Sequence, residues 1–565
     1  MGVMGDSRAW LRRTCEVVSR VGDEAHYLGC CARSGMFGLE SPRTLMAVVG
    51  ALADHGMLGG AVSVAAIRHP DRTAIIDERG EVTYHELDAR VNALANAWRA
   101  AGLAPRDGVG IMARNHRGAL EALFAAAKCG ARIVLMNTGF SAPQVREVAM
   151  REGVDLLVYD EEFELLLGGL ELRLGRCCAW TEQEPAGGEH TLEGLIAAAS
   201  PTAPPKPSRA PRLVILTSGT TGTPKGAGRD VPVSLSPVGG PLSKVPFRSG
   251  DTTQISAPLF HALGFTQGLL QIGLAATLVL QRRFAPAETL DSLARNHVST
   301  WVTVPVMLQR LLALGCEQWQ DRDLSPLRIV YVSGSQLGAR LTRETLARLG
   351  PVLYNLYGST EIAYATIATP ADLAVEPACV GRVVRGACVE ILGQHGDRLA
   401  AGVTGRIFVG HMIPFEGYTG GEDKERVRGL VASGDVGHFD SAGRLFIDGR
   451  DDEMIISGGE NVFPREVEDL LHLHPAVLEA AAVGVSDDEF GQRLRVFVVV
   501  RPGAELSEQD VKVYIRDKLA RYKVPREVTF LDELPRNPTG KVLKRELTAT
   551  GRWPQARADP AARCH

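Results

Sequence analysis

The sequence has no CxxC pair among its ten cysteines, and four of them form the adjacent pairs Cys30-Cys31 and Cys177-Cys178. This spacing offers neither zinc ligands nor a disulfide framework. We therefore expect free, mostly buried thiols and a reducing, cytoplasmic location.

The chain also lacks an excess of basic residues, because 62 Lys and Arg stand against 66 Asp and Glu. A nucleic-acid-binding protein would favour a strongly basic face, so we expect no nucleic-acid partner. No apolar run reaches about 18 residues, the length of a membrane span, and the N-terminus lacks the apolar stretch of a secretory signal. We expect no transmembrane segment, while peripheral membrane contact and the oligomeric state stay open.

The 565 residues suffice for more than one domain. Residues 1–60 are rich in Gly, Ala and Met and suggest a helical N-terminal extension. From Ala65 onward, apolar strands alternate with amphipathic helices, which predicts an α/β fold of layered, mostly parallel sheets. The proline-rich stretch 200–211 predicts an exposed linker, and it leads into a buried strand, "RLVILTSG".

The stretch "GVGIMA" (108–113) matches the loose dinucleotide pattern G-x-G-x-x-A. A true fingerprint lies between a strand and its helix. Here the glycines fall inside the predicted strand, and the helix starts only near His116. We therefore expect no dinucleotide-binding site.

The stretch "TSGTTGTPKG" (217–226) combines glycines, hydroxyl residues and Lys225 directly after the buried strand. Glycines let main-chain N–H groups approach an anion closely, and lysine supplies a point charge suited to phosphate. The pattern favours a loop that wraps a polyphosphate, although it is not a Walker A loop, since Lys225 is followed by Gly226. A flexible polar surface loop is the alternative.

Five ordered motifs resemble those of the adenylate-forming superfamily, which includes acyl- and aryl-CoA synthetases. They are "LTSGTTGTPKGA", "YGSTE" (357–361), "SGD" (433–435), "GRDDEMIISGGENVFPREVE" from Gly449, and "PRNPTGKVLKREL" around Lys541. The resemblance covers about residues 61–550 and looks closest to fatty-acyl-CoA synthetases. It implies a large AMP- and acyl-binding domain (61–449) and a small mobile α+β lid domain (450–565).

The resemblance assigns roles to individual residues. Lys541 is the expected catalytic lysine, and His261 is a gate beside the acyl carboxylate unless it is an ordinary core histidine. Glu361 is the expected Mg²⁺ ligand, since Mg²⁺ prefers hard oxygen ligands and substrate phosphates. The phosphate loop would hold ATP through Thr217, Ser218, Gly219, Thr220, Thr221, Gly222, Thr223 and Lys225.

Tyr357 offers a flat face for adenine, although a buried core tyrosine is the alternative, and Asp435 and Arg450 are suited to the ribose. The turn "VSGSQL" (332–337) resembles one that lines the adenine, but its Ser335 and Gln336 depart from the small-residue pattern. The remaining nucleotide contacts expected are Gly334, Ser335, Gly358, Ser359 and Thr360. Gly458 and Gly459 would let the backbone approach CoA.

The chemistry implied is attack of a carboxylate on the α-phosphate of ATP, followed by transfer of the acyl group to CoA with release of AMP. Lys541 cannot serve one step and vacate for the other without motion, so we place the pivot at Asp452. The expected substrate is a medium- to long-chain fatty acid. The alternatives are an acyl-AMP ligase or aryl-CoA ligase with another acceptor, and a non-catalytic nucleotide-binding relative.

Overall fold

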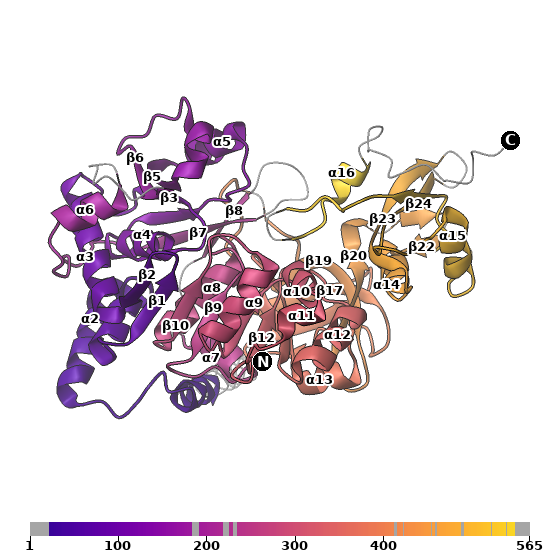
Figure 1. The fold of residues 1–565 in the computed structure, drawn as a ribbon, viewed down its shortest axis with the longest axis horizontal. Helices are drawn as coiled ribbons and strands as arrows, with labels where there is room; N and C mark the ends of the chain where they lie inside the picture. Colours follow the sequence, from indigo (N-terminus) through magenta and orange to yellow (C-terminus); the bar gives the residue numbers. More distant parts are fainter. Residues whose placement is uncertain are drawn as a thin grey trace, which may run out of the picture.

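The computed structural model describes most of the chain and places a large N-terminal α/β part beside a smaller C-terminal part with its own sheet (Figure 1). The predicted fold class of layered, mostly parallel sheets with a small second domain is confirmed. The expected domain boundaries and the mobility of the small part stay predictions. The described residues are 22–182, 191–217, 225–229, 234–411, 415–421, 423–453, 455–457, 460–487, 491–520, 523–537 and 540–548.

The largest sheet is parallel from β1 to β13 and carries antiparallel strands at both edges. One inner strand is the apolar run "IVYV", which is buried along its whole length, as expected for a parallel sheet covered on both faces. In spatial order the strands are β15 (Arg382–Val383), β14 (Ala363–Ala368), β13 (Leu353–Ser359), β12 (Ile329–Val332), β11 (Thr300–Thr303), β9 (Thr252–Ile255), β10 (Thr277–Leu280), β1 (Thr73–Asp77) and β2 (Gly80–Thr83).

A second sheet of six strands is parallel except for its last pair, β7 with β8. Gly108 lies inside β3, where a Cβ atom would come within 2.1 Å of the Gly153 carbonyl oxygen. The glycine of "GVGIMA" therefore serves strand packing, and α4 starts only after its N-cap His116, as predicted. The strands are β6 (Arg176–Trp180), β5 (Val154–Asp160), β3 (Gly108–Met112), β4 (Arg132–Leu135), β7 (Arg212–Thr217) and β8 (Lys225–Arg229).

Helices α3 and α4 lie between these two sheets, since α3 contacts β1 and β2 while its neighbour α4 contacts β3 and β4. A capping box between Thr83 and Glu86 starts α3. Every residue of α4 is buried, and its Lys128 ammonium is satisfied by Asp88 Oδ1 at 2.7 Å. The helices of the N-terminal part are α2 (Pro42–Arg68), α3 (Tyr84–Ala100), α4 (Arg117–Lys128), α5 (Ala142–Arg151), η1 (Glu161–Leu167), α6 (Leu192–Ala198), α7 (Ser236–Leu242), α8 (Ala262–Gly273), α9 (Pro286–Arg295), α10 (Pro305–Leu312), α11 (Cys316–Trp319), α12 (Ala339–Leu349) and α13 (Pro370–Val375).

Helix α2 is, within the described residues, the one helix long and apolar enough to cross a membrane by length and composition. Its backbone is not helical at Gly56 (φ 68°, ψ −173°), so two helical pieces meet at a kink. Leu45 and Met46 in the first piece are exposed, whereas Val62 in the second is fully buried against the core. A partly buried core helix of a globular protein meets the same criteria of length and composition.

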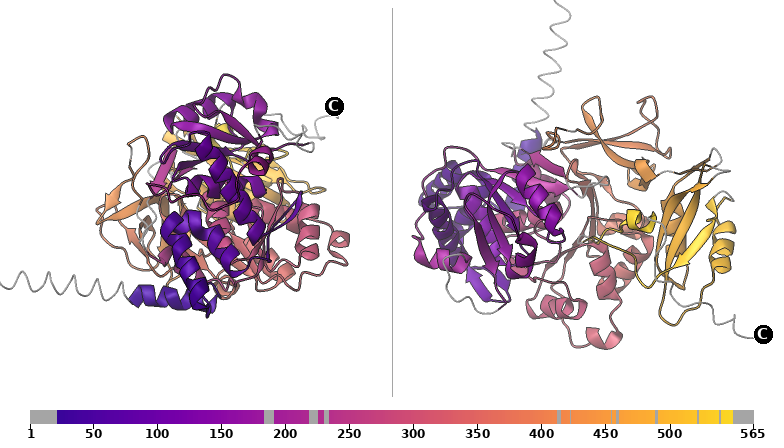
Figure 2. Two further views of the ribbon diagram at one scale, coloured as in Figure 1. Left: turned by 90° about the vertical axis from the view of Figure 1, so that its left-hand side faces the viewer. Right: turned by 90° about the horizontal axis from the view of Figure 1, so that it is seen from above.

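Two further sheets follow in the chain, the first antiparallel and the second antiparallel except for one parallel pair at its edge. The first consists of β16 (Ala387–Leu392), β17 (Gly405–His411), β18 (Arg426–Val427), β19 (Leu430–Phe439) and β20 (Leu445–Arg450). After the 3₁₀ turn η2 (Asp451–Glu453), the C-terminal part forms a sheet with two helices at its side and a short third helix near its end (Figure 2). Its elements are β21 (Ile455–Ser457), β22 (Glu460–Val462), α14 (Pro464–His472), β23 (Val477–Asp487), β24 (Gly491–Val500), α15 (Glu508–Arg516), β25 (Glu527–Phe530) and α16 (Lys544–Thr548).

Candidate active site

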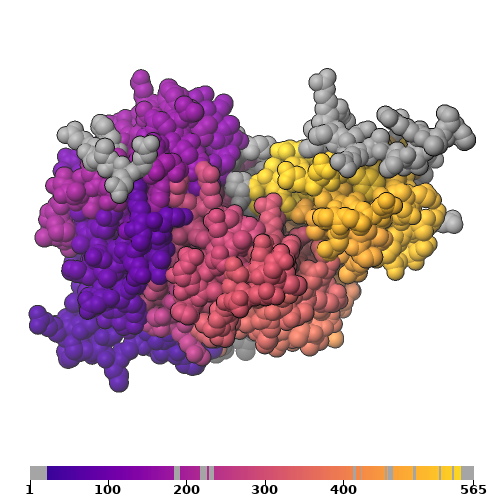
Figure 3. Space-filling view, viewed as in Figure 1, coloured from indigo at the N-terminus to yellow at the C-terminus, as the bar shows by residue number. Residues whose placement is uncertain are grey.

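A cleft with a volume of ≈ 1220 Å³ lies where the C-terminal part meets the large part, and Figure 3 shows these two parts in contact. Its walls include the segments that follow β9, β11, β12 and β13, at the edge where the carboxyl ends of parallel strands meet. Ligands of α/β sheets bind at this edge. The predicted residues that line the cleft are Lys225, His261, Gly334, Ser335, Tyr357, Gly358, Ser359, Thr360, Glu361, Asp435, Arg450 and Lys541.

Asp435 is held at the centre of a small polar cluster. The Tyr357 hydroxyl donates to Asp435 Oδ2 at 2.6 Å, and Arg450 Nη1 donates to Oδ1 at 3.2 Å. β19 and β20 bring Asp435 and Arg450 together because the two residues are antiparallel partners. A carboxylate fixed in this way can accept hydrogen bonds from two neighbouring hydroxyls.

Glu361 follows β13 and is held from two sides. The Ser359 hydroxyl donates to Oε2 at 2.8 Å, and the Tyr418 hydroxyl donates to Oε1 at 2.7 Å. Burial raises the pKa of the Glu361 carboxyl, but the nearby Lys424 ammonium and these two hydroxyl donors outweigh burial, so the pKa lies below its ordinary value. The residue is therefore an oriented carboxylate at neutral pH.

The donor set around Glu361 fits Mg²⁺ bound mainly through substrate phosphates. A carboxylate oxygen can still accept further bonds, and Mg²⁺ is usually held by one or two carboxylates together with phosphates and water. Within the described residues there is no group of three or more His, Cys, Asp or Glu side chains that could hold a metal alone.

The two ends of "TSGTTGTPKG" are fixed by a strand pair. Thr217 at the end of β7 is the antiparallel partner of Lys225 at the start of β8, and the Lys225 ammonium lies 5.4 Å from the centre of the Tyr418 ring. At Gly226 a Cβ atom would come within 2.7 Å of Thr419 Oγ1, so the close packing requires glycine. Both ends of the motif therefore lie near Glu361, which Tyr418 also contacts.

Several predicted contacts fall outside the described residues. They are Ser218, Gly219, Thr220, Thr221, Gly222 and Thr223 of the phosphate loop, and Gly458 and Gly459 of the loop expected to approach CoA.

The turn after β12 connects the two parts of the molecule. Gly334 has φ +94°, a conformation that favours glycine. The unexpected Gln336 donates through its side-chain amide to Asp469 on α14, and Arg340 Nη2 donates to the Leu478 carbonyl at 3.1 Å. The departure at Gln336 from the small-residue pattern is thus explained by a contact with the C-terminal part.

Lys541 reaches the cleft on a turn whose backbone is tied to Asn537. The Lys541 N–H donates to Asn537 Oδ1 at 2.9 Å. The neighbouring Gly540 has φ +79°, and a Cβ atom there would come within 2.2 Å of Val306 Cγ1 on α10. The lysine turn therefore packs directly against the large part, and the chain brings Lys541 to the same cleft as Asp435 and Glu361.

His261 stands at the N-terminus of α8 in the wall of the cleft. Its Nε2 atom is buried and has no hydrogen-bond partner among the described residues. Burial lowers the pKa of the imidazole to about 4, so the ring is neutral at physiological pH. It contacts Phe260, with ring centres 4.5 Å apart, and is partly buried in the wall of the cleft.

Sequence reasoning missed Tyr418 and Lys424, which both act on Glu361. They lie in an irregular stretch between β17 and β18, and no spacing or motif connects them with Glu361. Only the tertiary fold reveals this contact.

Comparison with known proteins identifies the family. The AMP-binding enzyme family matches residues 62–419, and the AMP-binding enzyme C-terminal domain matches residues 466–541. The chain belongs to the adenylate-forming AMP-binding enzymes. The predicted resemblance is thereby confirmed at the level of the superfamily.

Curated relatives match over almost their whole length. An indoleacetate–CoA ligase of Aromatoleum aromaticum is 33% identical over 494 residues, which are 85% of this chain and 95% of the relative. A fatty acid–acyl-carrier-protein ligase of Streptomyces coeruleorubidus is 31% identical over 514 residues, 86% and 94% of the two chains. The names of these two relatives give two different acids, indoleacetate and a fatty acid, and two different acceptors, CoA and acyl-carrier protein.

The fold matches solved structures as well. The o-succinylbenzoate–CoA synthetase of Bacillus subtilis, in complex with its acyl-adenylate intermediate, has a TM-score of 0.74 and 26% identity, covering 87% of this chain and 98% of that one. The shared architecture therefore spans both the N-terminal and C-terminal parts.

Proposed function

We propose that this AMP-binding enzyme is an ATP-dependent acid–CoA ligase that forms an acyl-adenylate and then a thioester, with release of pyrophosphate and AMP. The observation that carries the proposal is the convergence of Asp435, Glu361 and Lys541 from three separate segments on one cleft that also has an apolar wall. A non-catalytic relative would not need all three side chains at one place.

In the first half-reaction, the substrate carboxylate attacks the α-phosphate of ATP. Both reactants are anionic, so the barrier is lowered by positioning and by positive charge near the transferring group. Asp435 would hold the ribose hydroxyls, and Glu361 would hold Mg²⁺, which neutralises phosphate charge when bound. Lys541 would stabilise charge near the bridging oxygens, and its turn already packs against the large part.

In the second half-reaction, the thiol of CoA attacks the acyl carbon and AMP leaves. Lys541 must move away first, and the contacts of Gln336 and Arg340 with the C-terminal part must break. We place the pivot at Asp452, because its two neighbours are anchored to opposite sides. Arg406 Nε on β17 donates to Asp451 at 2.8 Å, whereas Lys544 on α16 donates to Glu453 at 2.6 Å.

The substrate is an acid with an apolar body. Leu263, Phe265 and Leu270 on α8 contribute to the wall of the cleft beyond His261, and Met57 and Leu58 on α2 contribute as well. Such a wall suits the expected medium- to long-chain fatty acid, and it equally suits a ring-bearing acid of the kind that the indoleacetate ligase uses.

The test is a screen of saturated acids from C2 to C20 and of aryl acids, with pyrophosphate, AMP and acyl-CoA measured separately. We expect AMP and acyl-CoA to form in equal amounts with at least one acid. Pyrophosphate release without acyl-CoA would instead support a carrier protein as acceptor, which the carrier-protein ligase relative favours. ATP binding without pyrophosphate release from any acid would refute the proposal.

A further inference from the structure

Helix α8 places an unsatisfied amide in the apolar wall of the cleft. Gln267 is 3% exposed and lines the cleft, yet its Oε1 atom has no hydrogen-bond partner within the described part of the chain. Buried side-chain polar atoms are normally hydrogen-bonded, and leaving one unpaired costs the full desolvation penalty. The unpaired Oε1 of Gln267 therefore lowers the stability of the fold when no ligand is bound.

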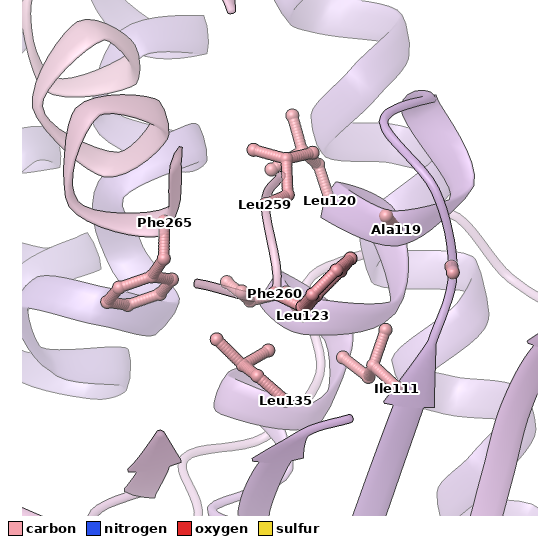
Figure 4. Close-up of a pocket in the computed structure, with 9 residues that line it drawn as sticks. Ile111, Ala119, Leu120, Leu123, Leu135, Leu259, Phe260 and Phe265 are labelled. Carbon is pink, nitrogen blue, oxygen red and sulfur yellow. The ribbon is translucent and has the colours of Figure 1, made fainter. Parts of the chain in front are cut away.

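Two neighbours of Gln267 on α8 provide no partner for its Oε1 atom. The Thr266 hydroxyl already donates to the Ala262 carbonyl at 2.6 Å, and the side chain of Leu270 is apolar. Neither residue therefore supplies a hydrogen-bond donor to Gln267. Beneath the same helix, a cavity of ≈ 10 Å³ is lined only by apolar residues, and Phe265 points into it from α8 (Figure 4). Gln267 does not line this small cavity, whereas it does line the large cleft.

A comparison with Gln271 separates this position from an ordinary buried glutamine. Gln271 lies one turn further along α8 and is 0% exposed. Its Oε1 accepts from the Thr253 hydroxyl at 3.1 Å, while its Nε2 is unpaired. It does not line the cleft, so it provides a control of the same residue type on the same helix.

We propose that Gln267 is a specificity-determining residue that accepts a hydrogen bond from a hydroxyl or N–H group on the body of the acid. This inference rests on the proposed function, because it assumes that the carboxylate binds near His261. Six residues separate the two positions, which corresponds to about 9 Å along a helix. The favoured substrate is then a ring-bearing or short acid with a polar donor about that far from the carboxylate, in place of a plain saturated fatty acid.

Selectivity follows from the unpaired amide. A site built to hydrogen-bond a substrate hydroxyl rejects the analogue without it, because the buried group is then left unpaired. An apolar pocket without such a group discriminates weakly between the same two analogues. Removing the amide should therefore abolish the preference and keep turnover of the apolar analogue.

The experiment compares matched acids in the parent, Gln267→Leu and Gln271→Leu. The pairs are 4-hydroxycinnamate with cinnamate and 8-hydroxyoctanoate with octanoate, and kcat/KM is measured by pyrophosphate release. We expect the parent and Gln271→Leu to prefer the hydroxylated member of at least one pair by tenfold or more. In Gln267→Leu the ratio should fall below about twofold, with the apolar acid used at least as well as by the parent.

Two results would overturn the inference: a parent that prefers the apolar member of both pairs, or a ratio that Gln267→Leu and Gln271→Leu change alike. The second result would mean that the two glutamines serve only the packing of α8. Calorimetric binding of the same acids gives a readout that does not need turnover. If no acid is adenylated but the hydroxylated acid binds the parent tenfold more tightly than Gln267→Leu, the proposed function fails and the recognition stands.

Discussion

Gly540 lies close to Val306, so the contact between the turn that carries Lys541 and the large part can be tested by adding one methyl group in Gly540→Ala. A Cβ atom at Gly540 would come within 2.2 Å of Val306 Cγ1 and 3.3 Å of Val306 Cβ. The β-branched valine is restricted about χ1 and lies at the start of a helix. In Gly540→Ala the turn must therefore retreat from α10 and carry Lys541 with it.

The size of the effect follows from the geometry. Carbon atoms in contact lie about 3.5–4.0 Å apart, so relief of the contact requires a retreat on the order of 1 Å. A misplacement of about 1 Å in a catalytic arrangement can cost 10²-fold in rate. The positive φ adds local strain of about 1–2 kcal/mol for a residue with a side chain.

Gly503 provides the matched control. It also has φ +79° and lies in the C-terminal part, but a Cβ atom there would meet nothing within 4 Å. Gly503→Ala therefore carries the same backbone strain without the contact. Both variants should lose similar stability, and only Gly540→Ala should lose about 10²-fold in adenylation.

The assay is single-turnover pyrophosphate release, with transfer from pre-formed acyl-AMP to CoA measured in parallel. Transfer should change less than threefold in both variants, because the proposed mechanism removes the lysine turn from the site in that step. Val306→Ala in the Gly540→Ala background removes the clashing methyl groups and should restore part of the adenylation rate. Equal adenylation rates in Gly540→Ala and Gly503→Ala would refute the docking argument.

Three further predictions concern single side chains of the cleft. Lys541→Ala should reduce adenylation by at least 10²-fold and leave transfer from acyl-AMP largely intact, and equal loss of both steps would remove the role assigned to it. Glu361→Gln should raise the Mg²⁺ concentration needed for half-maximal rate by tenfold or more, because the amide keeps the shape but loses the charge; an unchanged Mg²⁺ dependence would exclude it as the ligand. The pKa of His261 is about 4 in the folded protein, against 6.5 for an unperturbed histidine. Between these two pH values the unfolded state binds a proton that the folded state does not. The free energy of unfolding therefore decreases as the pH falls from 6.5 towards 4. When the pH is lowered from 7.5 to 5, the free energy of unfolding should fall in both proteins, and the fall should be about 2 kcal/mol smaller in His261→Phe than in the parent. Urea denaturation at the two pH values measures both. The His261 signal is assigned by NMR as the histidine signal of the parent that is absent from His261→Phe. If that signal titrates near pH 6.5, the lowered pKa is wrong.

Much of this architecture could be predicted because local sequence and fold agree. The apolar run before "TSGTTGTPKG" forms β7 at the position expected of a buried strand, and the glycines of "GVGIMA" lie inside β3, with the helix starting after His116. In each case a short apolar run bounded by turn residues determines the element.

The contacts between motifs could not be predicted in the same way. Glu361 was recognisable from "YGSTE", but Tyr418 and Lys424 come from an irregular segment, and Tyr418 is placed by a bridge to Ala227 of β8 that is distant in sequence. Gln336 looked like a departure from an expected pattern, and its role depends on Asp469 of another domain. The unpaired Oε1 of Gln267 is likewise a property of its surroundings and not of the helix sequence.

The ion pairs around η2 explain how a rotation at one residue can carry a distant lysine. The Lys544 Nζ atom donates to Glu453 Oε2 at 2.6 Å and lies 3.0 Å from Glu468 Oε1 on α14. Burial lowers the pKa of its ammonium, but Glu468 and Glu453 outweigh burial and raise the pKa above its ordinary value. Removing one partner of such a buried group leaves an uncompensated charge, so the cluster resists separation.

Lys541 stands three residues before Lys544, and α16 begins at Lys544. The lysine turn is therefore tied to the C-terminal side of η2, whereas Asp451 is tied to β17 through Arg406. The C-terminal part also contacts the large part through polar bonds from Gln336 to Asp469 on α14 and from Arg340 to the Leu478 carbonyl. Under the proposed mechanism we expect a change in backbone dihedrals at Asp452 to move Lys541 together with the C-terminal sheet.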